Sequence, residues 1–386
     1  MTKKTLVQKL DIFNSKFILR DKRFIWLDYD KGISIILVAY GHCFFMLLDH
    51  GVDMSAYPYF NYIGTFLYGF RMPLFFIVSG ILITKSLQKR GLSAYLRNRV
   101  SNILYPLLMW GFLQISLALM TSRFTHTDIT PVSYLNLIVS PRQTGHFWYL
   151  NALFFIGVLY ASLKTWCRLT TTIQLVIGGV FFSIAGYINI HDLHAGFLTD
   201  ICQFYLFFAL GDAISTVFLN EAFVKRYTSW KVFLPLLFIF LAVQYKFTEL
   251  NLHGGNDGIN YVEHKLPWFY LMEALIGCTL SVSLSFLLQK YRVFSFLRVV
   301  GYHSLFIYCM QIIVMSVMRM LLVNALKITS VPLLFVLIWS LGILIPIIIY
   351  NICLKLNAWW LFTFSKPLEH YEFAERSKIA REAIDK

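Results

Sequence analysis

Long apolar runs separated by short polar connections dominate this chain. A run of about 18 apolar residues suffices to cross a hydrocarbon core about 30 Å thick as an α-helix. We therefore predict an all-α, polytopic transmembrane helical bundle of about ten spans. The predicted spans are residues 33–48, 63–84, 103–120, 147–163, 172–188, 201–218, 232–247, 267–288, 304–323 and 331–352.

The basic residues gather on one side of these spans. Most of the 34 Lys and Arg residues fall in the two tails and in the alternate connections 85–102, 164–171, 219–231 and 289–303. Because cytoplasmic loops carry the excess of Lys and Arg, we expect both termini to be cytoplasmic. The predicted layout is a cytoplasmic N-terminal tail (1–23), one membrane domain (24–366) and a cytoplasmic C-terminal tail (367–386).

The composition agrees with a membrane protein and excludes a soluble enzyme. Hydrophobic residues make up 58% of the chain and charged residues 14%, whereas about 25% of residues are charged in soluble domains. The net charge of +14 is spread over short loops, so topology explains it and nucleic-acid binding is not expected. We expect a multi-pass protein of the bacterial inner (cytoplasmic) membrane.

Two ionisable residues mark the first predicted span, in the stretch KGISIILVAYGH. Lys31 and His42 are eleven positions apart. This spacing makes roughly three helical turns, so both side chains lie on one face, about 16 Å apart along the axis. An ionisable group inside a bilayer is costly and marks a functional site by default. The stripe predicts a site that begins near one membrane surface and ends inside the bilayer.

Three stretches together resemble a known family. They are LDYDKGISIILVAYGH (27–42), FRMPLFFIVSGILI (70–83) and HFWYLNALF (146–154), with YHSLFIY (302–308) as a weaker fourth. They are similar to the membrane-bound acyltransferase 3 family, particularly the branch resembling fucose 4-O-acetylase, in which Lys often replaces the Arg of an Arg-x10-His signature. Lys31 and His42 correspond to that pair. Arg71 and Gln311 depart from the branch, because many relatives have His at both positions.

The resemblance implies acyl transfer from a cytoplasmic acyl-CoA to a sugar hydroxyl at the outer face of the membrane. We therefore expect a membrane O-acyltransferase, most simply an O-acetyltransferase, that acts on a surface polysaccharide or its lipid-linked precursor. Acetyl-CoA is then the donor substrate, and no cofactor is bound permanently. Two other classes stay open: a polytopic transporter or flippase, whose buried charges line a permeation path, and a non-catalytic subunit of a polysaccharide assembly complex.

The signature pair suits this chemistry. Lys31, at the cytoplasmic end of its helix, offers a compact positive charge for the phosphates of CoA; the alternative is a basic flank that only sets topology. His42 lies deeper, and histidine is suited to proton transfer near neutral pH, so it is the candidate general base. Its alternative role is a hydrogen bond between helices.

Arg71 lies within the second span, just before Met72 and Pro73. Proline disrupts a helix, and broken helices occur at membrane depth where the backbone lines a cavity or packs in protein. The guanidinium is a candidate catalytic group that stabilises the oxyanion of acyl transfer or binds an acidic acceptor. The alternative is a structural ion pair with Glu273 or Asp212.

Further candidates flank the spans on both sides. His146, Trp148 and Tyr149 are candidate acceptor-binding residues, because flat aromatic rings cover sugar faces; an interfacial aromatic belt is their alternative role. The external loop 250–264 is a candidate acceptor contact. Arg90, Arg97 and Arg99 are candidate donor-binding residues, although topology also explains them. The six cysteines and the scattered histidines show no metal-ligand spacing, so no metal site is expected.

Overall fold

The computed structural model describes residues 13, 15–20, 24–125 and 130–365, which form helices joined by short connections. None of these residues lies in a β-strand, so the all-α prediction is confirmed. The long helices are α3 (Ile25–Asp49), α4 (Pro58–Phe66), α5 (Arg71–Ile81), α6 (Ile83–Arg99), α7 (Tyr105–Thr125), α9 (Trp148–Thr165), α10 (Thr171–Ile190), α11 (Phe197–Phe218), α13 (Trp230–Leu252), α15 (Pro267–Tyr291), α17 (Ser304–Met320) and α18 (Val331–Lys355). The shorter elements are α2 (Ser15–Arg20), η1 (Val100–Leu104), α8 (Ser133–Val139), η2 (Pro141–Thr144), α12 (Glu221–Tyr227), η3 (Gly255–Asn260), α14 (Tyr261–Lys265), α16 (Phe296–Tyr302), η4 (Leu321–Ala325) and η5 (Trp359–Leu361).

Within the described residues, nine helical segments are long and apolar enough to cross a membrane. Each overlaps one of the predicted spans, although the segment Ile83–Met120 begins twenty residues before the predicted span 103–120. The remaining predicted span, 147–163, corresponds to α9, which has 18 residues and carries Asn151 and Lys164. The Asn151 side chain is fully buried and donates to the carbonyl of Leu137 at 2.9 Å. The Asn151 amide NH2 group thus finds a partner inside the protein and Lys164 pairs with Asp212, whereas no described group donates to Asn151 Oδ1.

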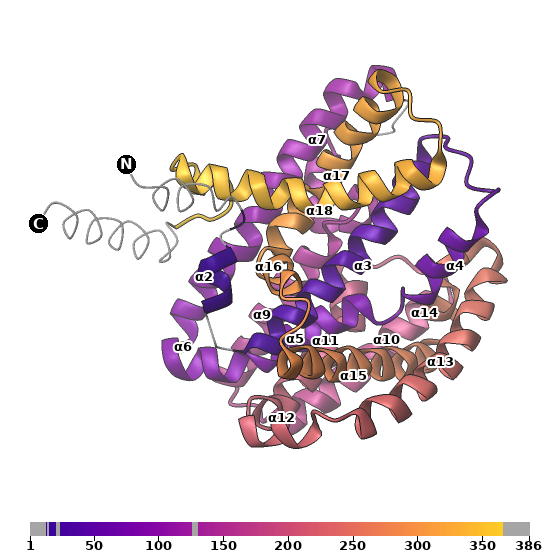
Figure 1. Ribbon diagram of the computed structural model, residues 1–386. Helices are drawn as coiled ribbons and strands as arrows, with labels where there is room; N and C mark the ends of the chain where they lie inside the picture. The colour runs from indigo at the N-terminus through magenta and orange to yellow at the C-terminus, as the bar shows by residue number, and fades with distance from the viewer. Residues whose placement is uncertain (1–12, 14, 21–23, 126–129, 366–386) are drawn as a thin grey trace, which may run out of the picture.

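The two ends of the bundle differ in charge. Figure 1 shows α2, α6, α12 and the C-terminal end of α18 toward one end, at left, and α4 and α14 at the other. α6 and α12 belong to the basic connections 85–102 and 219–231. Two of the connections that the charge pattern places in the cytoplasm therefore lie toward the same end of the molecule. Of the predicted tails, only residues 13 and 15–20 are described.

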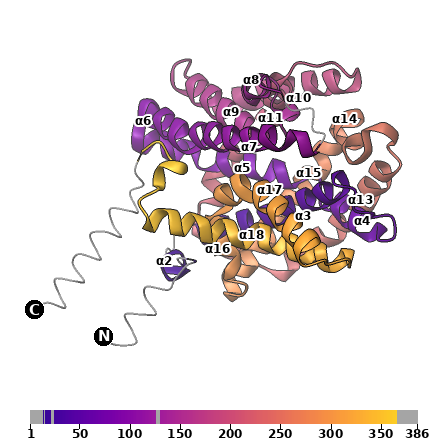
Figure 2. The same cartoon turned by 90° about the horizontal axis from the view of Figure 1, so that it is seen from above.

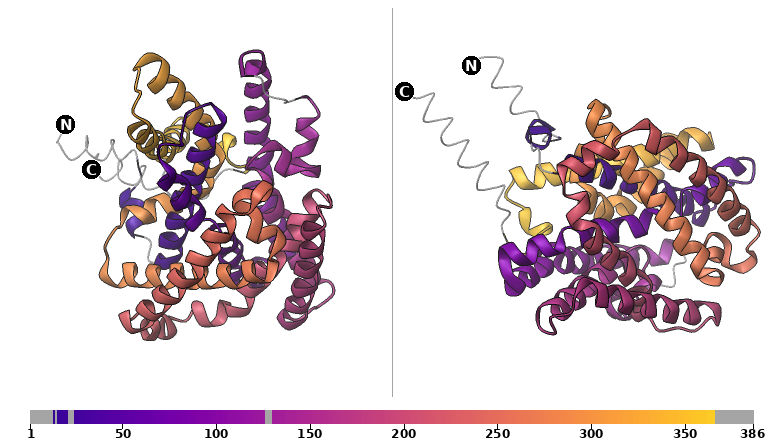
Figure 3. Two further views of the ribbon diagram at one scale, coloured as in Figure 1. Left: turned by 90° about the vertical axis from the view of Figure 1, so that its right-hand side faces the viewer. Right: turned by 90° about the horizontal axis from the view of Figure 1, so that it is seen from below.

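α3 is the central helix of the bundle. It packs against α5, α15, α16, α17 and α18. Figure 2 shows α9, α10 and α11 on one side of the molecule and α16 and α18 on the other, and Figure 3 shows the same arrangement from two further directions. Residues on α3 therefore reach the interior of the bundle along most of its length.

Glycines allow the closest helix crossings. A Cβ atom added to Gly301 of α16 would lie 1.8 Å from the carbonyl oxygen of Asp28 in α3. A Cβ atom on Gly80 of α5 would lie 2.0 Å from the carbonyl oxygen of Phe208 in α11. Small residues let membrane helices approach backbone to backbone, and these crossings fix α5 and α16 against their neighbours.

The second predicted span is broken into α4 and α5. Residues 67–70 form turns, and α5 begins at Arg71. The predicted disruption thus lies before Arg71, and Pro73 sits in the first turn of α5, where a missing N–H costs little because that group has no helical partner. The break places Arg71 at the start of a helix beside α3.

Candidate active site

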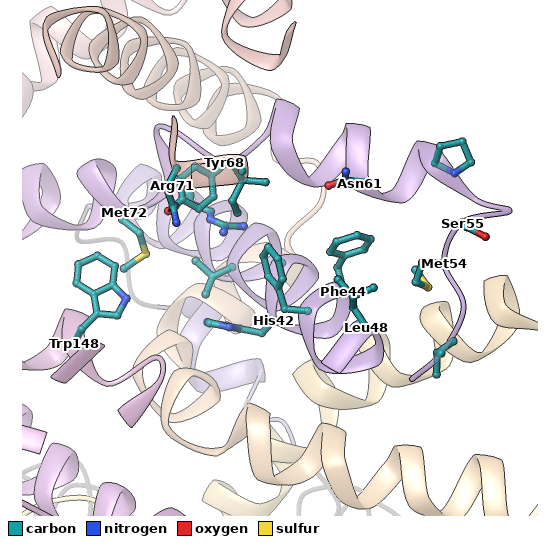
Figure 4. A pocket seen from close by; sticks show the side chains of 18 of the residues that line it. His42, Phe44, Leu48, Met54, Ser55, Asn61, Tyr68, Arg71, Met72 and Trp148 are labelled. Carbon is teal, nitrogen blue, oxygen red and sulfur yellow. The ribbon is translucent and has the colours of Figure 1, made fainter. Parts of the chain in front are cut away.

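A pocket of about 830 Å³ opens near the α4 and α14 end of the bundle. Figure 4 shows that His42, Arg71, Tyr68, Met72 and Trp148 lie around one part of it, and that Asn61, Ser55 and Met54 lie farther toward one side. The complete lining is Val38, Gly41, His42, Phe44, Phe45, Leu48, Val52, Asp53, Met54, Ser55, Pro58, Asn61, Tyr68, Arg71, Met72, Trp148, Gly258, Ile259, Asn260 and Tyr308.

The predicted signature pair lies on one unbroken helix. α3 runs from Ile25 to Asp49, and His42, which is half-buried, lines the pocket. Lys31 lies about three turns away toward the other end of α3 and is not among the residues that line the pocket. Its charge interacts with those of Asp28 and Asp30 on the same helix. The prediction that Lys31 and His42 share one helix is therefore confirmed, and the two residues lie toward opposite ends of α3.

A second histidine lies beside the first. The rings of His42 and His146 meet at 68° with centroids 5.5 Å apart. His146 precedes α9, outside the candidate spans, and is buried; Nε2 lies 3.1 Å from the carbonyl oxygen of Tyr308, and the Tyr308 hydroxyl donates to the His146 carbonyl. Burial lowers the pKa of His146 to about 3, so its ring is neutral at physiological pH.

Arg71 reaches the same pocket from α5. Its Nη1 donates to the carbonyl oxygen of Leu37 at 3.1 Å, and its guanidinium carbon lies 4.7 Å from the centroid of the Tyr68 ring. Gly41 makes room for it, because a Cβ atom there would lie 2.5 Å from Nη1. The guanidinium is therefore held on α3, one residue from His42.

The predicted structural ion pairs of Arg71 are not found. Asp212 instead pairs with Lys164 and accepts hydrogen bonds from Tyr160 at 2.7 Å and Thr171 at 2.9 Å. Glu273 forms no ion pair within the described part of the chain, and its polar neighbour is the Gln244 side chain. Among the described residues no carboxylate forms an ion pair with Arg71. Arg71 therefore lines the pocket without an ion-pair partner in the described part of the chain.

A polar network, which we call the outer network, supports the wall of the pocket beside Arg71. Glu263 accepts from Gln203 Nε2 at 2.7 Å and from Arg142 Nη2 at 3.4 Å, and its Oε2 lies 3.1 Å from the Tyr68 hydroxyl. Arg142 also pairs with Asp200 at 2.7 Å. None of these contacts was predicted from the sequence, apart from the expectation that loop 250–264 approaches the acceptor.

The predicted aromatic residues divide between the pocket and the core. Trp148 lines the pocket, and the guanidinium carbon of Arg142 lies 4.4 Å from its ring centroid. Tyr149 is buried and packs against Phe76 and Tyr308, with ring centroids 5.3 Å from each. Tyr149 is absent from the pocket lining, so only its neighbour faces the cavity.

The predicted donor arginines do not form one cluster. Arg90 and Arg97 are exposed on α6, toward the end of the bundle opposite the pocket. Arg99 is buried, and its Nε donates to the Tyr95 hydroxyl at 2.7 Å. Arg97 and Arg99 thus face opposite sides, as their separation by two positions requires in a helix.

The comparisons with known proteins agree with these motifs. A family model described as an acyltransferase domain, acyltransferase 3, matches residues 24–351. Two relatives named nodulation protein NolL are similar in part. The protein of Mesorhizobium japonicum is 30% identical over 154 residues (39% of this chain and 38% of the relative), and that of Sinorhizobium fredii is 29% identical over 171 residues (42% and 44%). The matched region thus spans less than half the length of these relatives, and no solved structure matches the chain. Because the family model covers most of the sequence, this multi-pass membrane protein belongs to the acyltransferase 3 family.

Proposed function

We propose that the protein is a membrane O-acyltransferase, most simply an O-acetyltransferase of the bacterial inner membrane. It moves an acyl group from cytoplasmic acyl-CoA to a sugar hydroxyl of a surface polysaccharide or its lipid-linked precursor. The observation that carries this proposal is that His42 and Arg71 line one pocket, at the opposite end of α3 from Lys31. Family membership supports an enzyme over a transporter or an assembly subunit.

The pocket suits a sugar acceptor. Its volume of about 830 Å³ lies in the range of small-molecule sites. The lining combines the aromatic side chain of Trp148 with the polar side chains of Asn61, Asn260 and Tyr68. An aromatic face covers the apolar side of a sugar ring, and amide and hydroxyl groups hydrogen-bond its hydroxyls. Of the three predicted acceptor-binding residues, Trp148 is therefore the best candidate, because it lines the pocket and His146 and Tyr149 do not.

The chemistry needs a base and a site for negative charge. His42 takes the proton of the acceptor hydroxyl, and the oxygen attacks the thioester carbonyl. The tetrahedral intermediate then carries a negative oxygen, which the guanidinium of Arg71 stabilises. Collapse of the intermediate breaks the C–S bond, and the thiolate of CoA receives the proton from His42. His146, neutral and beside His42, does not repel the imidazolium that forms.

The donor approaches from the basic end of the bundle. Lys31 is about 16 Å along α3 from His42, and Asp28 and Asp30 lie beside it. In this proposal the ammonium meets the phosphates of acetyl-CoA, and the pantetheine arm extends along α3 toward His42. Arg90 and Arg97, exposed on α6, are available to the same phosphates from solution, whereas the buried Arg99 contacts a donor only from within the bundle.

Mass spectrometry of surface glycans tests the proposal. Glycans from a deletion strain, the strain complemented with the wild-type gene and the strain complemented with His42→Ala are compared. We expect one acyl mass to be lost on deletion and restored only by the wild type. Purified protein in lipid nanodiscs with radiolabelled acetyl-CoA and the deacylated glycan should reproduce the transfer. Unchanged glycans in the deletion strain would favour a transporter or an assembly subunit.

A further inference from the structure

Tyr68 touches two parts of the pocket that are far apart in the sequence. It lies in the turn between α4 and α5, three positions before Arg71. The Arg71 guanidinium carbon lies 4.7 Å from the centroid of its ring. A cation over an aromatic face is attracted by the ring quadrupole, more strongly where water is excluded. The ring therefore limits the directions in which the guanidinium points.

The hydroxyl of Tyr68 reaches the opposite wall. It lies 2.6 Å from Oδ1 of Asn260 and 3.1 Å from Oε2 of Glu263, and it donates its single proton to one of these acceptors. Asn260 ends η3 and lines the pocket, and Glu263 belongs to α14. Both elements come from the external loop 250–264, which the sequence singled out as an acceptor contact.

Glu263 is a firm anchor for this contact. It is 3% exposed and is also held by Gln203 at 2.7 Å and Arg142 at 3.4 Å. Arg142 is in turn paired with Asp200 and lies over the ring of Trp148. The outer network thus joins three parts of the pocket, namely Asn260, Trp148 and the turn that contains Tyr68. Tyr68 is the residue through which this network contacts Arg71.

We propose that Tyr68 is a positioning residue for the acyl transfer, which couples the acceptor-contacting wall at Asn260 to the orientation of Arg71. This inference rests on the proposed function. The two halves of the side chain act differently. The ring orients the guanidinium toward the reacting carbonyl, and the hydroxyl holds η3 at the distance at which Asn260 meets the acceptor.

Two substitutions separate the halves. Tyr68→Phe keeps the ring over Arg71 and removes the hydroxyl, so the acceptor KM should rise about tenfold while kcat stays within about twofold. Tyr68→Leu removes both, so kcat should fall about tenfold in addition. Tyr62 of α4 is exposed, stacks on Phe66 and is absent from the pocket lining. Tyr62→Phe and Tyr62→Leu are therefore matched controls, and both constants should stay unchanged.

A double-mutant cycle tests whether Tyr68 acts through Arg71. The rates of wild type, Tyr68→Leu, Arg71→Gln and the double variant are measured with radiolabelled acetyl-CoA at equal amounts of monodisperse protein. If Tyr68 orients Arg71, the substitution Tyr68→Leu should lower the acyl-transfer rate about tenfold when Arg71 is present. In the Arg71→Gln background the same substitution should lower the rate less than twofold.

The possible outcomes distinguish a failure of the proposed function from a failure of the inference about Tyr68. If the wild type transfers no acyl group, the proposed function is overturned, and the inference with it. If the wild type is active but Tyr68→Phe leaves the acceptor KM unchanged, the inference is overturned and the function stands. Additive effects of Tyr68→Leu and Arg71→Gln on kcat overturn it in the same way. If Arg71→Gln has no measurable rate, the Tyr68→Phe comparison alone decides.

Discussion

The rings of His42 and His146 lie at 68° to one another, with centroids 5.5 Å apart, although the residues belong to segments more than a hundred positions apart. His146 is fixed from both sides, by its Nε2 contact with the Tyr308 carbonyl and by the Tyr308 hydroxyl on its own carbonyl. With Nε2 protonated in the neutral ring, Nδ1 is the nitrogen that accepts. His42 thus has an uncharged neighbour that two contacts with Tyr308 hold in place.

This burial of His146 predicts a loss of stability in mild acid. The unfolded chain binds a proton at His146 below about pH 6.5, whereas the folded chain binds it only near pH 3. Stability therefore falls as the pH drops from 6.5 toward 3, and at pH 5 the loss is about 2 kcal/mol. His146→Gln keeps a donor for the Tyr308 carbonyl and removes the titration, so its Tm in detergent should fall less between pH 7 and pH 5 than that of the wild type.

Two further histidines, His194 and His303, bear on the interpretation of this experiment. His194 is exposed, so His194→Gln should lose as much Tm as the wild type. Burial also lowers the pKa of His303 to about 4, which adds a loss of the same sign to every variant and cancels in the comparison. Equal Tm losses in His146→Gln and the wild type would contradict the assignment.

His42→Ala should abolish acyl transfer while the protein still inserts and accumulates. The half-buried ring faces the pocket, so its removal enlarges a cavity that exists already rather than creating one in the core. Acyl transfer and membrane abundance are measured together. His50→Ala, an exposed histidine just past the end of the same helix, is the matched control and should be fully active. Normal acyl transfer by a well-expressed His42→Ala protein would refute the assignment of His42 as the general base.

Local periodicity explains what the sequence predicted well. The spans, and the placement of Lys31 and His42 on one helix, follow from hydrophobic runs and from about 3.6 residues per turn, which are properties of neighbouring residues. The break beside Arg71 carries a local signal as well, from the proline at position 73. The break itself lies before Arg71 because a proline is tolerated in a first turn.

Contacts between distant segments explain what the sequence missed. The contact of the Arg71 guanidinium with Gly41 depends on how α5 packs against α3. Tyr68 contacts Glu263, which is 195 positions away in the sequence. Hydrophobic periodicity carries no information about which polar side chains meet across helices. For the same reason, charge alone suggested Glu273 or Asp212 as partners of Arg71, whereas Lys164 lies beside Asp212 in the folded bundle.

Gly41→Ala should impair catalysis more than folding. The added Cβ would lie 2.5 Å from Nη1 of Arg71, which must move. Because Nη1 is the end of a flexible side chain, the helices need not separate, but the guanidinium leaves its position beside His42. A shift of about 1 Å in a catalytic group costs up to about 10²-fold in rate. Gly179→Ala, where a Cβ meets no atom within 4 Å, is the control. A fully active Gly41→Ala enzyme would show that the position of Arg71 is unimportant.

The pocket should open on the outer side of the membrane, because the basic connections lie at the other end. Ser55 is exposed at the pocket, and Cys167 is exposed in the basic connection 164–171. One variant carries only a cysteine at position 55 and another carries only Cys167. In intact spheroplasts, an impermeant maleimide should label the first at once and the second only after lysis. The reverse pattern would invert the topology.

Arg71→Lys separates a catalytic role of Arg71 from a structural one. Lys keeps the positive charge but lacks the planar fork of donors with which a guanidinium can hold the Leu37 carbonyl and meet a developing oxyanion together. If Arg71 serves the reaction, the Lys variant should accumulate normally and lose turnover on the order of 10²-fold, as on removal of one oxyanion donor. Arg71→Ala should lose at least as much.

A structural role gives a different pattern for the same two variants. A positive charge needed only for folding would be supplied by Lys, so Arg71→Lys would work nearly normally and Arg71→Ala would be depleted from the membrane. Because no described carboxylate pairs with Arg71, we expect the first pattern. Acyl transfer per amount of membrane protein is measured for both variants and for Arg168→Lys, an exposed arginine far from the pocket in sequence that should be unaffected. Full activity of Arg71→Lys would refute the catalytic assignment, since this substitution keeps the charge but removes the guanidinium fork that the assignment requires.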